Sequence, residues 1–121
     1  MKKYLVIGNP IEHSLSPKLH NYWIKKNNLD AVYNKKQSNE NDIEGIINEV
    51  KNGKIDGINV TVPFKKLVIP FLDKLTPLAK ETHSVNTIYK EKEQGVDVVV
   101  GAKTDVGGFK QSLEYINYNV K

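Results

Sequence analysis

The sequence predicts an α/β fold: a three-layer sandwich around a mostly parallel sheet of about six strands, with an antiparallel hairpin near the C-terminal end. Strand and helix patterns alternate along the first half of the chain, which favours right-handed βαβ units and a parallel sheet. Two apolar runs, at residues 85–90 and 96–101, are then joined by only five residues, 91–95. A connection of that length suits a hairpin.

The first strand is predicted at residues 2–8, before the turn at Asn9-Pro10. The pair Ser16-Pro17 is typical of a helix start, because serine caps a helix and proline suits its first position. Apolar residues at helical spacing carry this helix to about Asn28.

The second strand is predicted at residues 31–37, followed by a helix that begins at Asn41 or Asp42 and stops at Asn52-Gly53. The third strand is predicted at residues 56–62, where β-branched residues alternate with polar ones. Pro63 ends that strand and suits a first helical turn, so a helix is expected at residues 64–72.

A short helix is predicted to open at Thr76-Pro77, before the hairpin. A last helix is expected to begin at Thr104 or Asp105 after the final strand. Its apolar face would carry Phe109, Leu113, Ile116 and Val120.

The 121 residues amount to one domain, 1–121, that is large enough to bury a core. The chain has no cysteine, which excludes disulfides, thiol catalysis and thiolate zinc sites and fits a reducing compartment. Its apolar runs are shorter than a signal sequence or a membrane span requires. We therefore expect a soluble, cytoplasmic protein that does not bind membranes.

The net charge of +4 comes from 18 basic residues, all of them lysine. They are scattered among acidic residues and form no basic stripe, and arginine, which reads guanine and clamps phosphate, is missing. The charge pattern therefore argues against nucleic-acid binding and remains compatible with a small anionic ligand.

Neither a glycine-rich dinucleotide motif nor a P-loop occurs in the sequence. His13, His20 and His83 lack metal-ligand spacing, so surface or capping roles are expected for them and no metal site is predicted.

Polar side chains gather instead at the predicted strand ends, which in a parallel sheet converge on one edge. They are Ser14, Ser16, Asn59, Thr61, Lys65, Asn86, Thr104 and Asp105. Each has an ordinary structural explanation when taken singly, as a cap, a turn residue or a solvated lysine. Together they indicate a ligand site.

These residues fall in four ordered motifs: Ser14-Leu15-Ser16-Pro17, Asn59 to Lys65 (NVTVPFK), Val85-Asn86-Thr87, and Thr104-Asp105 followed by Gly107-Gly108-Phe109. The set resembles the substrate-binding half of shikimate dehydrogenase along essentially the whole chain. The resemblance implies an oxidoreductase of aromatic amino acid biosynthesis that reduces 3-dehydroshikimate to shikimate with NADP as cofactor. The chain departs from the family pattern at His83-Ser84, where Gly-Ala is usual, and at Lys103, where Asn is usual.

The resemblance also implies the role of each site residue. Ser14 and Ser16 would hold the ring carboxylate, Thr61, Asn86 and Asp105 the ring hydroxyls, and Lys65 with Asp105 would be the catalytic pair. Reduction of a ketone makes an alkoxide, so an acid at that oxygen lowers the barrier, and Lys65 can be that acid. A nearby Asp105 would favour its ammonium form.

The family's NADP-binding Rossmann domain is expected to be absent from these 121 residues, so the isolated chain should be inactive. In the resembled family the end of the missing half packs back on this domain, so its loss would favour self-association. Two alternatives stay open: a quinate/shikimate dehydrogenase domain, and a non-catalytic module that senses shikimate.

Overall fold

The structure is a computed structural model that describes residues 2–11 and 16–103. Its elements in chain order are β1 (Lys2–Gly8), α1 (Ser16–Lys26), β2 (Ala31–Gln37), the 3₁₀ turn η1 (Glu40–Asp42), α2 (Ile43–Lys51), β3 (Gly57–Val60), the 3₁₀ turn η2 (Ile69–Phe71), β4 (Lys74–Leu75), α3 (Pro77–Thr82), β5 (Thr87–Glu93) and β6 (Val96–Ala102). The last helix expected from the sequence lies outside the described residues.

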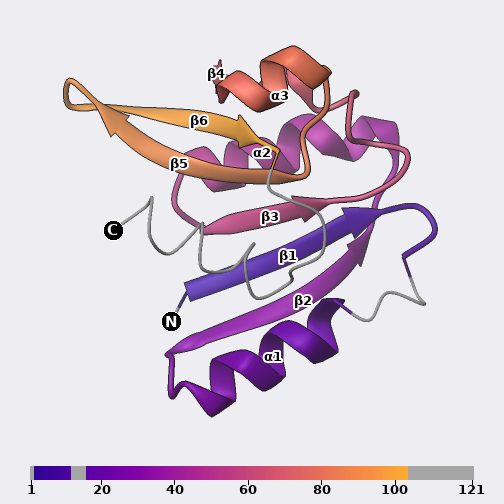
Figure 1. The fold of residues 1–121 in the computed structure, drawn as a ribbon, viewed down its shortest axis with the longest axis vertical. Coiled ribbons are helices and arrows are strands. Elements are labelled where there is room, and N and C mark those ends of the chain that lie inside the picture. The colour runs from indigo at the N-terminus through magenta and orange to yellow at the C-terminus, as the bar shows by residue number, and fades with distance from the viewer. Residues whose placement is uncertain (1, 12–15, 104–121) are drawn as a thin grey trace.

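The six strands form one mixed sheet in the order β2-β1-β3-β5-β6-β4 (Figure 1). The pairs β1/β2, β1/β3 and β4/β6 are parallel, whereas β3/β5 and β5/β6 are antiparallel. This topology confirms the predicted α/β fold, including the antiparallel hairpin near the C-terminal end.

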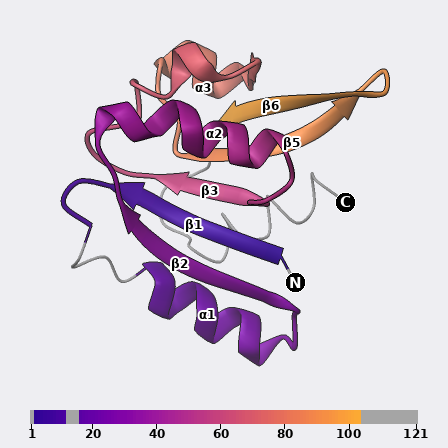
Figure 2. The same cartoon turned by 180° about the vertical axis from the view of Figure 1, so that it is seen from behind.

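Helices cover both faces of the sheet, as Figures 1 and 2 show from opposite sides. On one face, Ile46 and Ile47 of α2 and Ala79 of α3 pack with alternate strand residues such as Ile58. On the other face, Ile24 of α1 belongs to a cluster with Tyr4, Val6, Ile11, Tyr33, Tyr89, Val100 and Ala102. Alternate residues of β1, β5 and β6 therefore pack into the two cores on opposite faces of the sheet, which makes three layers.

Left-handed residues end the first two helices, as the sequence predicts for α2. At the end of α1, Asn28 has φ 56°, and the Leu29 N–H reaches back to the Ile24 carbonyl. At the end of α2, Gly53 has φ 84°, and the Lys54 N–H bonds the Glu49 carbonyl. Both ends satisfy carbonyls that the last helical turn leaves without partners.

The hairpin is tighter than the expected five-residue connection. Glu93 pairs with Val96, so only Gln94 and Gly95 lie between the strands. Both have positive φ, 51° and 82°, which is the geometry of a two-residue turn that matches the twist of a hairpin. The run of charged residues before the turn therefore belongs to β5, not to a loop.

The prediction of a helix at residues 64–72 is wrong. β3 ends at Val60, and the chain then makes turns at residues 62–63 and 65–68 before the short 3₁₀ turn η2. Phe64 and Val68 are buried in the α2-side core, and the Val68 N–H donates to the Phe64 carbonyl. The two buried side chains, Phe64 and Val68, are four residues apart and lie on one helical turn. Pro70 lacks an N–H and prevents a regular helix through this segment.

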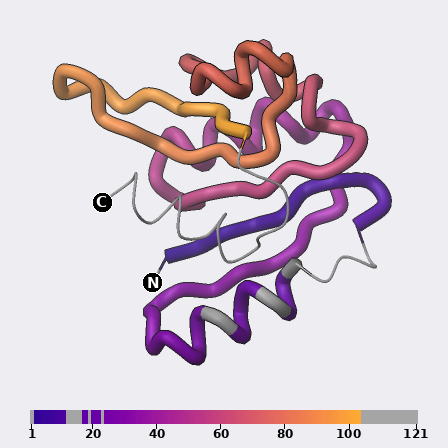
Figure 3. Tube along the Cα trace, in the orientation of Figure 1, coloured from indigo at the N-terminus to yellow at the C-terminus, as the bar shows by residue number. Residues whose placement is uncertain are grey.

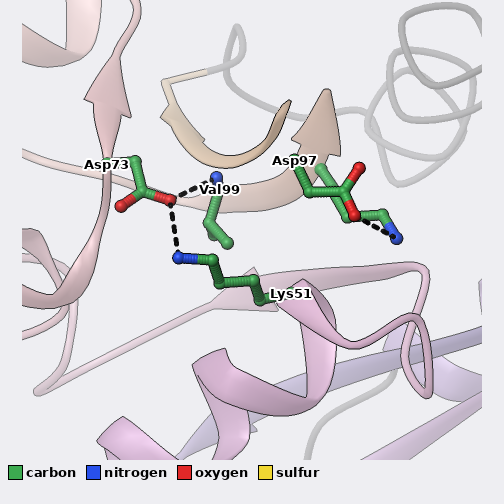
Figure 4. Close-up of polar contacts among 5 residues, drawn as sticks. Lys51, Asp73, Asp97 and Val99 are labelled. Atoms are coloured by element: carbon green, nitrogen blue, oxygen red, sulfur yellow. Dashed lines mark hydrogen bonds and ion pairs between the residues drawn. The ribbon is translucent and has the colours of Figure 1, made fainter. Parts of the chain in front are cut away.

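The edge strands are held by side chains from neighbouring elements. Asn21 of α1 donates from Nδ2 to the Tyr33 carbonyl at 2.6 Å and accepts the Tyr33 N–H at 2.9 Å. At the other edge, Asp73 accepts the Val99 N–H at 2.9 Å and lies 3.9 Å from the Lys51 ammonium (Figure 4). The segment that leads into β4 is thereby fixed to β6.

Among residues 2–11 and 16–103, no helix is long and apolar enough to cross a membrane.

His83 gives a stability prediction, because it ends α3 in the left-handed region with φ 53° and ψ 44°. A side chain there is unfavourable, whereas glycine is not, so His83→Gly should raise the free energy of unfolding by about 1 kcal/mol. Denaturant unfolding measures it. Glu81→Gly, inside the same helix, is the matched control and should cost about 1 kcal/mol. A lower stability of His83→Gly would contradict this account of the position.

Candidate functional site

The carboxyl ends of β1 and β3 meet the beginning of β5 at one edge of the sheet. Ile7 is in register with Val60, and Asn59 with Thr87. The Val60 N–H donates to the Asn86 carbonyl at 2.9 Å. Because β5 runs antiparallel to β3, Asn86 enters this edge from the start of a strand, while Thr61 enters it from the end of one.

Thr61 is held directly against Gly8. The Thr61 N–H donates to the Ile7 carbonyl at 3.0 Å, and the Asn9 N–H donates to the Val62 carbonyl at 3.1 Å. A Cβ placed on Gly8 would lie 2.4 Å from the Thr61 methyl and 3.1 Å from the Val62 carbonyl oxygen. Only glycine leaves room for this approach of β1 to the Thr61 segment.

Lys65 lies in the segment between β3 and β4, whose path Figure 3 traces. The Lys65 carbonyl accepts the Val85 N–H at 2.9 Å, which places Lys65 beside the residue that precedes Asn86. The flanking Phe64 and Val68 are buried, at 2 % and 0 % exposed, and Lys65 itself is half-buried. The backbone that carries Lys65 is therefore anchored on both sides.

A hydrogen-bonded group of side chains backs this edge. The Tyr33 hydroxyl donates to Asn59 Oδ1 at 2.6 Å, and the Thr87 hydroxyl donates to Asn86 Oδ1 at 3.1 Å. Asn59 Nδ2 lies 3.4 Å from both the Asn86 carbonyl oxygen and Thr87 Oγ1. The sequence placed Asn59 among the strand-end residues, but Tyr33 was missed because it lies in the middle of another strand.

The surface or capping role expected for His20 is wrong. Its side chain is 1 % exposed, and its ring stacks on that of Tyr33 with centroids 4.0 Å apart and an angle of 5°. Its spacing of four residues from the buried Ile24 would have placed it on the inner face of α1. His83 does end a helix, as a backbone cap.

Backbone hydrogen bonds place the segments that carry Thr61, Lys65 and Asn86 next to one another at one edge of the sheet. Ser16 is the first residue of α1. Ser14 and Asp105 lie outside the described residues, so the pairing of Lys65 with Asp105 stays a prediction. In the part of the chain that the structure describes, no three His, Asp or Glu side chains gather to hold a metal ion.

A hydroxyl, a carboxamide and an ammonium on one anchored edge can bind a small anionic ligand that carries hydroxyl groups.

The chain matches known proteins along most of its length. Residues 6–88 match the family model of the shikimate dehydrogenase substrate binding domain. The chain is 53 % identical over 120 residues to a shikimate dehydrogenase (NADP(+)) of Pelagibacter ubique, covering 99 % of this chain and 44 % of that protein. A Pyrococcus furiosus protein of the same name is 41 % identical over 113 residues, which are 93 % of this chain and 40 % of that protein.

Among solved structures, Thermus thermophilus shikimate 5-dehydrogenase in complex with shikimate superimposes with a TM-score of 0.77 at 30 % identity. That match covers 95 % of this chain and 42 % of the Thermus chain. The chain thus spans less than half the length of each of these three relatives.

Proposed function

This chain belongs to the family of shikimate dehydrogenase substrate-binding domains, and from that premise we propose that it forms the shikimate site of an NADP-dependent shikimate dehydrogenase. The proposed reaction is the reduction of 3-dehydroshikimate to shikimate. The observation that carries the proposal is the convergence of Thr61, Lys65 and Asn86 on one sheet edge, tied through the Val85 N–H and the Asn86 carbonyl.

In this proposal Thr61 and Asn86 bind ring hydroxyls, and Lys65 gives a proton to the oxygen that becomes a hydroxyl. Ser14 and Ser16 hold the ring carboxylate, and Asp105 holds both a hydroxyl and the Lys65 ammonium. The roles of Ser14, Ser16 and Asp105 rest on the sequence motifs. A carboxylate can be held by hydroxyl donors at a helix start, which fits Ser16 as the first residue of α1.

NADP would be bound by a part of the enzyme other than residues 1–121, because these residues contain no glycine-rich nucleotide motif. The relatives' names include NADP(+), and each extends well beyond the matched region. A cytoplasmic location and self-association of the isolated domain stay predictions.

We expect residues 1–121 alone to bind shikimate weakly and to oxidise no NADPH with 3-dehydroshikimate. A ligand that is bound by this domain alone keeps more of its hydration than one enclosed between two domains, and its hydrogen bonds to the protein compete with water. Titration of backbone amide signals with shikimate tests binding, and absorbance of NADPH tests turnover. Amide signals near the Gln94-Gly95 turn, at the other end of the hairpin, serve as the internal control.

Turnover by this chain alone would contradict the assignment of the cofactor site to another domain. Signals of Thr61 and Asn86 that fail to shift at any shikimate concentration would contradict the proposed site. Equal shifts with quinate would favour the quinate/shikimate alternative.

A further inference from the structure

A row of hydrogen-bonded side chains crosses the α1-facing side of the sheet and ends at Asn86. It begins at the Tyr33 hydroxyl on β2, which donates to Asn59 Oδ1 on β3 at 2.6 Å. Asn59 Nδ2 faces Thr87 Oγ1 on β5 at 3.4 Å, and the Thr87 hydroxyl donates to Asn86 Oδ1 at 3.1 Å. The row therefore joins three strands to a residue of the candidate site.

The sheet register explains why these side chains meet. Asn59 lies opposite Val6 of β1 and opposite Thr87 of β5, so the Tyr33 side chain reaches over β1 to its partner. Tyr33 is 1 % exposed and Thr87 0 % exposed. Hydrogen bonds at buried positions meet less competition from water, and they hold a geometry better than surface contacts do.

Tyr33 is itself fixed from outside the sheet. Asn21 brackets its backbone with two hydrogen bonds, of 2.6 and 2.9 Å, and the His20 ring lies flat on its ring. Both residues come from α1, the helix that begins at Ser16. The orientation of the Tyr33 side chain is thus set by contacts with α1 and β3 before any ligand binds.

The consequence at the site concerns the direction of the Asn86 carboxamide. Its oxygen accepts from Thr87, so its nitrogen lies on the opposite side of the group. An amide nitrogen only donates hydrogen bonds, whereas an amide oxygen only accepts them. A carboxamide with a fixed direction presents its donor to a ligand without an ordering cost at the moment of binding.

We propose that Tyr33, Asn59 and Thr87 are positioning residues that hold the Asn86 carboxamide with its nitrogen toward a hydroxyl of the ligand. This inference rests on the proposed function for the identity of the ligand. In this inference the three residues contribute to the discrimination between ligands without touching the ligand, because they set the direction in which the Asn86 amide nitrogen donates its hydrogen bond.

The first experiment needs no ligand. The heteronuclear NOE of the Asn86 side-chain amide reports how rigid that group is in residues 1–121. Thr87→Val removes the hydroxyl with little change of shape, so the NOE should fall, and Thr87→Ser, which keeps the hydroxyl, should restore it. Tyr33→Phe should lower the NOE less, because Asn59 lies between Tyr33 and Thr87 in the row. Thr82→Val removes a hydroxyl that bonds the Leu78 carbonyl in α3 and should leave the Asn86 signal unchanged.

The second experiment is a double-mutant cycle on shikimate affinity. Thr87→Val should weaken binding roughly 3- to 10-fold, as expected for loss of one hydrogen bond. In the Asn86→Ala background the same change should weaken it by less than about 2-fold, because the group to be positioned is gone. The loss of melting temperature caused by Thr87→Val should also be smaller in the Asn86→Ala background, because the hydrogen bond between the two side chains is already absent there.

An unchanged Asn86 NOE in Thr87→Val would overturn the inference, as would equal losses of affinity in the two backgrounds. If the NOE falls as expected but the parent chain binds no shikimate, the positioning role is supported and the proposed function is contradicted. The two failures are therefore distinguishable.

Discussion

Replacement of Lys65 by alanine should lower turnover by roughly 10²- to 10⁴-fold, the usual contribution of a positioned acid, while the Michaelis constant changes much less. The reason is that proton transfer to the developing alkoxide occurs in the transition state and not in the bound ground state. The assay is steady-state kinetics on a chimera of residues 1–121 and the part of the Pelagibacter ubique relative that the match leaves uncovered.

Ser14→Ala in the same chimera is the contrasting variant. Its proposed partner, the carboxylate, is remote from the reacting carbon, so the Michaelis constant should rise with turnover less affected. If Lys65→Ala keeps its turnover and only raises the Michaelis constant, Lys65 is a binding residue and the acid lies elsewhere.

The second large effect is expected at Gly8, which carries no side chain to contact a ligand. Gly8→Ala would place a Cβ 2.4 Å from the Thr61 methyl, so either β1 or the Thr61 segment must shift. Overpacking of this kind costs about 1–3 kcal/mol in the free energy of unfolding. Shikimate affinity should fall as well, because Thr61 moves with its segment.

Gly45→Ala is the matched control for this variant. Gly45 is exposed in α2, and a Cβ there would meet nothing within 4 Å. Alanine should raise stability by about 0.5–1 kcal/mol, because it is the better helix former. Denaturant unfolding and a shikimate titration of both variants decide the matter. A Gly8→Ala chain with unchanged stability and affinity would show that the contact with Thr61 is loose.

The fold and the strand ends that carry the candidate site could be predicted from the sequence because their signals are local. The β-branched alternation around Ile58 and Val60 and the stop at Gly53 depend only on neighbours in the chain. The same holds for the placement of Thr61 and Asn86, which follows from the ends of the predicted strands. A strand end can be located from the alternation of apolar and polar residues and from the residue that interrupts it.

The segment at residues 64–72 could not be predicted in the same way. Its helical spacing is real, since Phe64 and Val68 are both buried, but Pro70 interrupts a regular helix and tertiary contacts fix the path of the segment. The Lys65 carbonyl bonds the Val85 N–H, and Asp73 bonds β6 through Val99. Both partners are far away in the sequence.

The role of Tyr33 was hidden for a related reason. A tyrosine in the middle of a strand is most often a core residue, and this one is buried. Its contact with Asn59 depends on the sheet order, because β1 lies between β2 and β3. Strand order is set by packing of the whole sheet and not by any local signal.

The direction of β5 places the two ends of the hairpin far from each other. Asn86 precedes β5 at the site edge, so the turn at Gln94-Gly95 lies at the far end of the same hairpin, where it projects from the molecule (Figure 1). Both turn residues are exposed, and the chain contains no cysteine. Gln94→Cys would thus give a unique attachment point for a fluorophore or a surface tether. A probe there would leave the ligand edge open to solvent, so immobilised chains would present their sites uniformly.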